Sequence, residues 1–554
     1  MQCETTPNRR RREAAAAVAV ALAVPLGVSV IAAPAQAAGR ATLPVFGVRS
    51  AGLSEAQTAG LARALGLKQI ARGEDGSVRY AAEKSFLSVP TRVTGEGKDE
   101  DGQPTTTTVL DVAALKRLRT ISEADALRRS AKALGAAKLL PRGAKASARK
   151  TTVTAVDRRG RTTVSAALDT AVSYAFTLAG LPYEGPGAKI RVAFDGKGAA
   201  TSLSFSTRTL AQAGSVEVLT AAEARARCAK AMGPAVRVAS ATPIYWAPAL
   251  STGAQTIEPS FRCAGVDVAG AQAQRVVVPA AVDAPLAAAP EPQEPRGTAG
   301  PAAGASKSTQ SGPASRAYGR ADVGSEGTGV CSGLPYTSNN LNSFNNQFTS
   351  RGIPVEFSWR DHNAWEQDFK DPAFGGDDSN WADHVDMTYW QGHGSPTGFS
   401  FAGCSSNDDT FLANTEARWG NGDVEWMSLF TCLILAQESG GKRWWQRWGP
   451  AFAGLHQINS FHTVSYHSAS HGGTYANYML RSPFLWWNNP MPVRSAWAQA
   501  SIDDQPASVV WASMGPIGPG GSVNMNDYFW GKGPVGPDVP AASVTGYWYI
   551  SGAS

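Results

Sequence analysis

The last two fifths of the chain alternate between short apolar runs and stretches with helical spacing. Strand-like runs lie at 355–359, 385–390, 424–430, 452–458 and 508–512, and helical patterns at 339–351, 438–448, 474–480 and 492–502. Short apolar runs separated by helices are typical of parallel strands joined by crossovers. We therefore predict that residues 320–554 form a three-layer α/β/α domain, with a mostly parallel sheet and helices on both faces.

The first half shows a different pattern. The segments 53–66, 121–135 and 219–233 each place a Ser or Thr three residues before an acid or amide. Each continues with apolar residues at helical spacing and stops at a Gly, so each has the start and stop signals of a helix. β-branched runs between them, such as 151–156 and 189–194, predict strands. Residues 38–278 are therefore expected to form an α+β region.

The N-terminus and the middle of the chain match neither pattern. Arg9–Arg12, the apolar run 14–33 and Ala35-Gln36-Ala37 fit an export signal cleaved after residue 37. The arginines also leave a twin-arginine route open. Residues 279–319 consist mainly of Pro, Ala, Gly, Ser and Gln, a composition that cannot bury enough surface to fold. We expect a secreted protein whose two folded regions are joined by a cleavable linker.

Charge divides the chain at the same place. Residues 1–319 contain 40 Lys and Arg against 24 Asp and Glu, and residues 320–554 contain 11 against 21. Opposite charge favours contact between the two halves, although unrelated drift of surface charge would give the same balance. No basic stripe with interleaved aromatic residues is present, which argues against a nucleic-acid partner. No later run is long enough to span a bilayer, so no membrane contact is expected once the signal is removed.

Five cysteines follow the export signal, and an odd number in an oxidising compartment leaves one thiol unpaired. Cys228 can pair with Cys263 in the basic half, and Cys331 with Cys404 in the acidic half. Cys432 is then the free thiol.

Two strand-like runs end on reactive side chains. Residues 387–392 lead to His393, and residues 426–431 lead to Cys432. The carboxyl ends of neighbouring parallel strands meet at one edge of a sheet, where ligands bind. A thiol near its free pKa is mostly protonated at neutral pH, and a nearby imidazole can activate it. We therefore predict a catalytic pair made of His393 and Cys432.

This ordered pair resembles the caspase, gingipain and legumain class of cysteine peptidases, in which one apolar block ends in His-Gly and a later one ends in the nucleophilic Cys. The sequence of residues 392–395, Gly-His-Gly-Ser, is more similar to the gingipain and clostripain-like branch than to caspases. The resemblance implies an endopeptidase acting on protein or peptide substrates without a cofactor or metal. It also implies that the backbone N–H groups of Gly394 and Cys432 face the oxyanion. Thr431 and Leu433, which flank Cys432, depart from the small and polar residues usual in the class.

The N-terminal helix-and-strand units resemble the PepSY-like modules in pro-regions of secreted bacterial peptidases. The phrase Leu181-Pro182-Tyr183-Glu184-Gly185-Pro186-Gly187 adds to this resemblance. It implies that the first half is an intramolecular pro-region that inhibits or helps to fold the second half.

Two other functions remain open. The histidines at 456, 462, 467 and 471 would serve a metal-dependent hydrolase, although their spacing matches no standard zinc motif. A catalytically inactive domain of the same fold would instead bind a polymer through its tryptophans. For the peptidase, His456, Trp390 and Ser395 are candidate residues of the substrate pocket.

Overall fold

Five parallel strands form the centre of the C-terminal sheet. The computed structural model describes residues 40–99, 102–141, 143–233, 236–267, 273–286, 321–401, 410–483 and 488–554. In spatial order the strands are β17 (Val355–Arg360), β16 (Val323–Gly327), β18 (Met387–Gln391), β22 (Trp426–Phe430) and β25 (Gln457–Phe461). The next two strands, β26 (Val510–Ile517) and β27 (Gly546–Ala553), are antiparallel. The predicted α/β class is confirmed, and the sheet as a whole is mixed.

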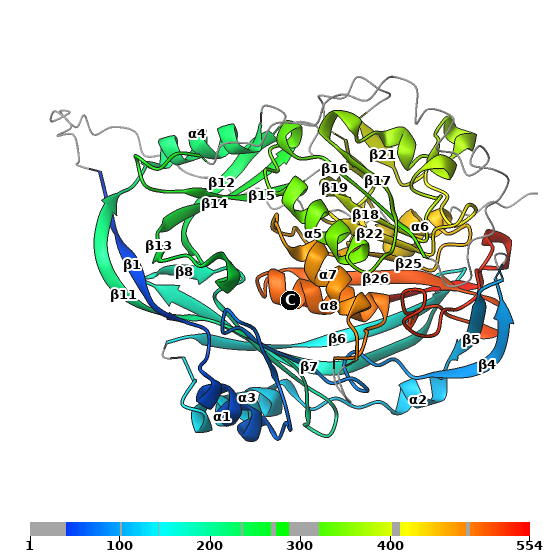
Figure 1. Ribbon diagram of the computed structural model, residues 1–554, viewed down its shortest axis with the longest axis horizontal. Helices are drawn as coiled ribbons and strands as arrows, with labels where there is room; N and C mark the ends of the chain where they lie inside the picture. Colours follow the sequence, from blue (N-terminus) through cyan, green and yellow to red (C-terminus); the bar gives the residue numbers. More distant parts are fainter. Residues whose placement is uncertain are drawn as a thin grey trace, which may run out of the picture. The chain divides into compact units, whose positions relative to one another are not determined.

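The sheet continues into the N-terminal half of the chain (Figure 1). The further strands are β6 (Lys145–Asp157), β7 (Thr162–Leu178), β9 (Lys189–Phe194), β10 (Ala200–Ser206), β3 (Val78–Ala81) and β2 (Ala71–Arg72). Each pairs with the one before it, and β6 pairs with β27 from Thr152 to Asp157. An unpaired strand edge invites association with other chains. The N-terminal half removes that hazard from β27, and residues 41–554 form one compact unit.

The three predicted N-terminal helices are present. They are α1 (Glu55–Leu65), α3 (Glu123–Ala136) and α4 (Ala221–Met232). In each, the side-chain oxygen of the Ser or Thr cap accepts the backbone N–H three residues later, as the sequence pattern predicts. Leu61 and Leu134 are fully buried and belong to one core cluster with Val192 and Phe194. Local capping and an apolar stripe thus suffice to place these helices.

A second N-terminal group of elements is joined by a disulfide. We call α4, β12 (Val236–Trp246), β14 (Pro259–Asp267) and β15 (Ala273–Pro279) the disulfide-linked module. β14 pairs with both β12 and β15, and Cys228 on α4 is bonded to Cys263 on β14. The predicted Cys228–Cys263 pair is confirmed. A disulfide is compatible with an oxidising compartment and so with export.

Helices and turns cover the two faces of the C-terminal sheet. On one face, α5 (Thr337–Thr349), α7 (His471–Leu480) and α8 (Val493–Asp504) share a buried cluster with Tyr389. On the other, Trp390 packs in a separate cluster with residues of α6 (Trp444–Trp448). Consecutive residues of a strand point to opposite faces, which explains why Tyr389 and Trp390 enter different cores.

Two predicted boundaries are wrong. The helix expected at 438–448 is reduced to α6, because Gly440 and Gly441 both have positive φ and turn the chain between β23 (Glu438–Ser439) and β24 (Lys442–Arg443). The strand expected at 452–458 begins only at Gln457, as β25. The export signal, Cys404 and Trp486–Trp487 lie outside the described residues. No helix in the described part of the chain is long and apolar enough to cross a membrane.

The remaining elements are short or peripheral. They are β1 (Thr42–Ala51), β4 (Thr91–Lys98), β5 (Pro104–Leu110), α2 (Val112–Arg117), β8 (Leu181–Glu184), β11 (Arg208–Glu217), β13 (Thr256–Ile257), β19 (His393–Ser395), β20 (Gly398–Ser400) and β21 (Phe411–Ala413), with short 3₁₀ turns between them.

The shared sheet predicts that the two halves stay together after the chain is cut. A protease site engineered within residues 290–315 should yield two fragments that co-elute in gel filtration, because β6 remains paired with β27. Lys189 adds contacts by donating to the carbonyl oxygens of Ile502 and Gln505. The fragments should separate only in denaturant. Separate elution under native conditions would contradict this arrangement.

Candidate active site

The structure brings His393 and Cys432 to the same edge of the sheet. β18 and β22 are hydrogen-bonded parallel neighbours whose last aligned pair is Gln391 and Phe430. His393 and Cys432 each follow two residues later. A Cβ at Gly394 would lie 2.4 Å from Thr431 Oγ1 and 3.0 Å from the Cys432 carbonyl oxygen. The backbones of the two strand ends are thus in contact, and a glycine is required at 394.

The hydrogen bond of the His393 ring fixes its tautomer. Its Nε2 lies 2.7 Å from the carbonyl oxygen of Ser332. A carbonyl can only accept, so Nε2 carries the hydrogen and the neutral ring keeps its basic lone pair on Nδ1. Burial lowers the pKa of His393 to about 4, although the bond to Ser332 acts in the opposite direction. His393 is therefore an uncharged base at neutral pH.

The carbonyl of Ser332 is itself held in place. Ser332 is the last residue of the 3₁₀ turn Val330–Ser332, and its N–H donates to the carbonyl oxygen of Gly329. Asp361 Oδ1 accepts the N–H of Gly329 at 2.8 Å and of Cys331 at 3.1 Å. Asp361 is buried and has a φ of 52°, a conformation that non-glycine residues seldom adopt. Cys331 is in a disulfide as well. The sequence contains no motif that points to these supports.

The thiol of Cys432 is buried against one neighbour. Its Sγ lies 3.8 Å from the Ser465 carbonyl oxygen and 3.7 Å from Ser465 Oγ. Burial raises the pKa of the thiol, and Ser465 and the charge of Arg275 partly offset that rise. Among the described residues Cys432 is the only free cysteine, which confirms the prediction of an unpaired thiol. Leu433 has a φ of 65°, so the backbone is strained immediately after the thiol.

His467 lies close to His393, which the sequence did not suggest. Burial and, to a smaller extent, the charge that His393 would carry together lower the pKa of His467 to about 3. Its Nε2 is 3.3 Å from Thr337 Oγ1, and its ring packs on Tyr336 with centroids 5.4 Å apart. Two neutral imidazoles, those of His393 and His467, therefore lie near the edge of the sheet that carries Cys432.

The disulfide-linked module covers this edge through the loop that follows β25. Arg275 of β15 lies over the ring of Tyr466, 5.1 Å from its centroid, and Trp246 of β12 packs on the same ring at 5.1 Å. Tyr466 directly follows Ser465, which contacts the thiol, and its hydroxyl donates to Glu184 at 3.2 Å. The N-terminal half is therefore packed against the residue next to Ser465, which closes over Cys432.

The same module also touches the turn that supports His393. A Cβ at Gly333 would lie 2.8 Å from the carbonyl oxygen of Ala231, in the last turn of α4. Gly333 directly follows Ser332. The module thus contacts both sides of the candidate site, and His393 and Cys432 are left only 8% and 7% exposed.

The three predicted pocket residues do not line this edge. Trp390 is fully buried among Phe369, Phe399 and Phe401. Ser395 is buried, and its Oγ bonds to Thr397 and to the carbonyl of Gly398 within its own hairpin. These placements correct the prediction for both residues, because the faces of a strand and of a hairpin cannot be assigned from an apolar run alone.

His456 is also misplaced by the sequence analysis, because β25 begins after it rather than before it. Its backbone N–H donates to Glu425, which precedes β22, so it lies at the amino ends of the parallel strands. Its ring bridges Asp527 at 2.6 Å and Asp538 at 3.0 Å. Burial opposes the charge, but bonds to both carboxylates raise the pKa of His456 to about 9. A protonated imidazole cannot bind a metal.

The other members of the histidine cluster have separate partners. His462 Nδ1 lies 3.1 Å from the Tyr549 hydroxyl, and His471 lies between Tyr389 and Ser501. Within the described residues, the only group placed to share an ion is Asp386, Asp423 and Glu425, which contains no histidine. The geometry gives no support to a metal site at 456–471.

Comparisons with known proteins identify a family model but no function. A model described as a domain of unknown function, DUF6345, matches residues 325–552, a range that contains both His393 and Cys432. No curated protein matches. An uncharacterized protein from Eubacterium rectale is similar at 12% identity and a TM-score of 0.24, over 44% of this chain and 85% of its own. The Bacillus megaterium YpeB C-terminal domain is similar at 15% identity and a TM-score of 0.18, over 42% and 94% of the two chains.

The close approach at Gly394 predicts that any side chain at this position destabilises the fold. Gly394→Ala should reduce the free energy of unfolding by about 1–3 kcal/mol, because its Cβ overlaps Thr431 Oγ1. Adding Thr431→Ala should recover part of the loss by removing that atom. Gly214→Ala is the matched control, since nothing lies within 4 Å of its Cβ position. Urea denaturation measures all three, and an unaffected Gly394→Ala variant would contradict the close approach.

His456 predicts a pH-dependent contribution to stability. Its folded pKa of about 9 exceeds the unfolded value near 6.5, so its stabilisation is complete below pH ~6.5 and is lost as the pH rises through ~9. His456→Gln should therefore be most destabilising, relative to the native protein, below pH ~6.5. The difference should shrink towards pH ~9. Denaturation curves across this range measure it, and a constant difference would show that His456 is neutral when folded.

Proposed function

We propose that residues 320–554 are a cysteine hydrolase, an endopeptidase that uses Cys432 as nucleophile and His393 as base, and that the structure represents its latent state. The observation that supports this most is the parallel register of β18 and β22, which ends each strand two residues before one of these side chains, at one edge of the sheet. The parallel strands β17, β16, β18, β22 and β25 are compatible with the parallel sheet that the caspase-like resemblance implies. The free thiol and the fixed tautomer of His393 fit the same chemistry.

The proposed reaction uses these groups in turn. His393 Nδ1 takes the thiol proton as the sulfur attacks the carbonyl carbon of the scissile bond, and the C=O electron pair moves to the oxygen. The N–H groups of Gly394 and Cys432 would donate to that oxyanion. The amine then leaves with the proton from His393, which forms the thioester. A water molecule, deprotonated by His393, releases the acid and restores the thiol.

Latency follows from burial. The shifted pKa values keep both members neutral, as thiol and imidazole, and a thiol is a weak nucleophile. Arg275 and Trp246 hold Tyr466, and with it Ser465, over the sulfur. The N-terminal half would thus inhibit the site as an intramolecular pro-region. Because β6 shares the sheet with β27, activation would displace the disulfide-linked module rather than release the whole half.

A non-catalytic binding domain of the same fold is the second candidate. The observation that favours it is the burial of Cys432, since buried cysteines are commonly inert. A metal-dependent hydrolase at 456–471 has weaker support, because those histidines have separate partners.

Opening the cover should expose the thiol. Trp246→Ala removes the ring that packs on Tyr466 and should increase the rate of iodoacetamide labelling at Cys432 by about tenfold or more. Trp445→Ala, another half-buried tryptophan outside the module, is the matched control. Labelling is located by peptide mass spectrometry. Equal rates in both variants would show that the module does not cover the thiol.

The opened variant also tests catalysis. Trp246→Ala should cleave a mixed peptide library, and adding Cys432→Ala should abolish the cleavage while leaving the melting temperature unchanged. Cleavage that persists without Cys432 would exclude the proposed nucleophile. An opened, labelled and inactive protein would favour the binding domain.

A further inference from the structure

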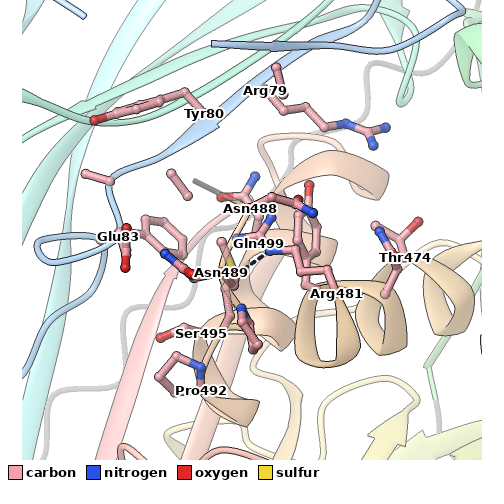
Figure 2. A pocket seen from close by; sticks show the side chains of 18 of the residues that line it. Arg79, Tyr80, Glu83, Thr474, Arg481, Asn488, Asn489, Pro492, Ser495 and Gln499 are labelled. Carbon is pink, nitrogen blue, oxygen red and sulfur yellow. Dashed lines mark hydrogen bonds between the residues drawn. The ribbon is translucent and has the colours of Figure 1, made fainter. Parts of the chain in front are cut away.

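A cavity lies between the N-terminal half and the helices of the C-terminal domain. It has a volume of about 1000 Å³ and is bordered by residues 66–88 on one side and by α7, α8 and the segments next to them on the other. Figure 2 shows Arg79 and Tyr80 on the strand side, and Arg481, Asn488 and Asn489 on the helix side. Neither His393 nor Cys432 lines it, and the proposed hydrolase reaction does not use it.

The wall of this cavity is strongly basic. Six cationic residues among the described ones line it, against one carboxylate, that of Glu83; the six are Lys68, Arg72, Arg79, Lys84, Arg481 and Arg494. Lys68, Arg72 and Lys84 are exposed at its rim. Four of the six belong to the basic N-terminal half, and Arg481 and Arg494 belong to the acidic C-terminal half, so both sides of the cavity contribute positive charge. Such a concave basic surface attracts anions.

Arg494 is the observation that points to a ligand. Its side chain is 1% exposed, and its Nε and Nη2 donate only to neutral oxygens of Met525, Leu87 and Asn526. Its Nη1 has no hydrogen-bond partner among the residues that the structure describes. A buried cation without a counter-ion is costly, so an anion bound in the cavity would supply what the fold lacks.

The neighbouring polar groups are already oriented. Arg79 lies 3.3 Å from Asp503, which also accepts from Tyr478 and Gln499. Arg481 is held by the carbonyl oxygen of Asn489 and lies over the ring of Tyr478. These contacts fix two guanidinium groups at the cavity, where each can pair with a carboxylate through two parallel bonds.

We propose that this cavity binds an acidic peptide segment. Its carboxylates would pair with Arg79, Arg481 and Arg494, and the amides of Asn488 and Gln499 would bond to its backbone. The volume lies at the upper end of ligand pockets and suits several residues of extended chain rather than a small anion. The unpartnered Oε1 of Gln499 is an acceptor suited to a backbone N–H. Binding here does not depend on hydrolysis at Cys432.

The test uses the full chain with Cys432→Ala, so that no probe is consumed. Fluorescence anisotropy is measured with a labelled peptide of alternating Glu and Asn and with a matched peptide in which Gln replaces Glu. The Glu peptide should bind at least about tenfold more tightly, and its affinity should fall as salt is added, because the pairing is electrostatic. It should also raise the melting temperature, as any ligand of the folded state does. Equal affinity for the two peptides would overturn the proposal.

Charge reversal at the rim locates the site. Lys68→Glu with Lys84→Glu should weaken binding of the Glu peptide by at least about tenfold. Lys98→Glu with Lys132→Glu is the matched control, because both are exposed lysines of the same half that do not line the cavity. Melting temperatures confirm that both variants fold. Equal losses of affinity in the two variants would overturn the location of the site. Polygalacturonate, an acidic polysaccharide, tests the ligand class, and tighter binding of it than of the Glu peptide would overturn the assignment to a peptide.

Discussion

The parallel pairing of β18 with β22 is the constraint on which the candidate chemistry depends. The two strands align Gln391 with Phe430, so both end at the same level of the sheet. One residue of slippage would turn one of the two side chains to the opposite face of the sheet, since side chains alternate along a strand. Gly394 then allows the two strand ends to touch. Burial of the alternating residues in two separate cores holds this register in place.

The N-terminal half contacts the C-terminal domain in two ways, by sheet pairing and by side-chain packing. β6 continues the sheet from β27, a contact made by backbone hydrogen bonds along six residues. The disulfide-linked module instead meets the candidate site through Arg275, Trp246 and the end of α4. Side-chain contacts of this kind open at lower cost than a strand leaves a sheet. One half of the chain can thus serve both as scaffold and as cover.

Buried ionisable groups in this protein differ in how the fold compensates the cost of burying their charge. His456 lies between two carboxylates and keeps its charge, whereas burial holds His393 and His467 neutral, in His393 against the opposing effect of the bond to the Ser332 carbonyl oxygen. Arg494 is buried with only neutral hydrogen-bond acceptors in the described part of the chain. Compensated groups of the first kind are typical of structural ion pairs, and groups of the second and third kinds mark candidate functional sites.

The sequence by itself determined the local features. Caps and apolar periodicity located the helices at 55–65, 123–136 and 221–232, and the apolar runs located β18 and β22, because these signals act within a few residues. Cysteine parity identified Cys432 as the free thiol. Only the tertiary structure decided that β6 extends the C-terminal sheet, that Asp361 and Ser332 orient His393, and that His456 lies at the opposite edge. Those contacts join residues far apart in the chain, and no local pattern encodes which distant surface a side chain will meet.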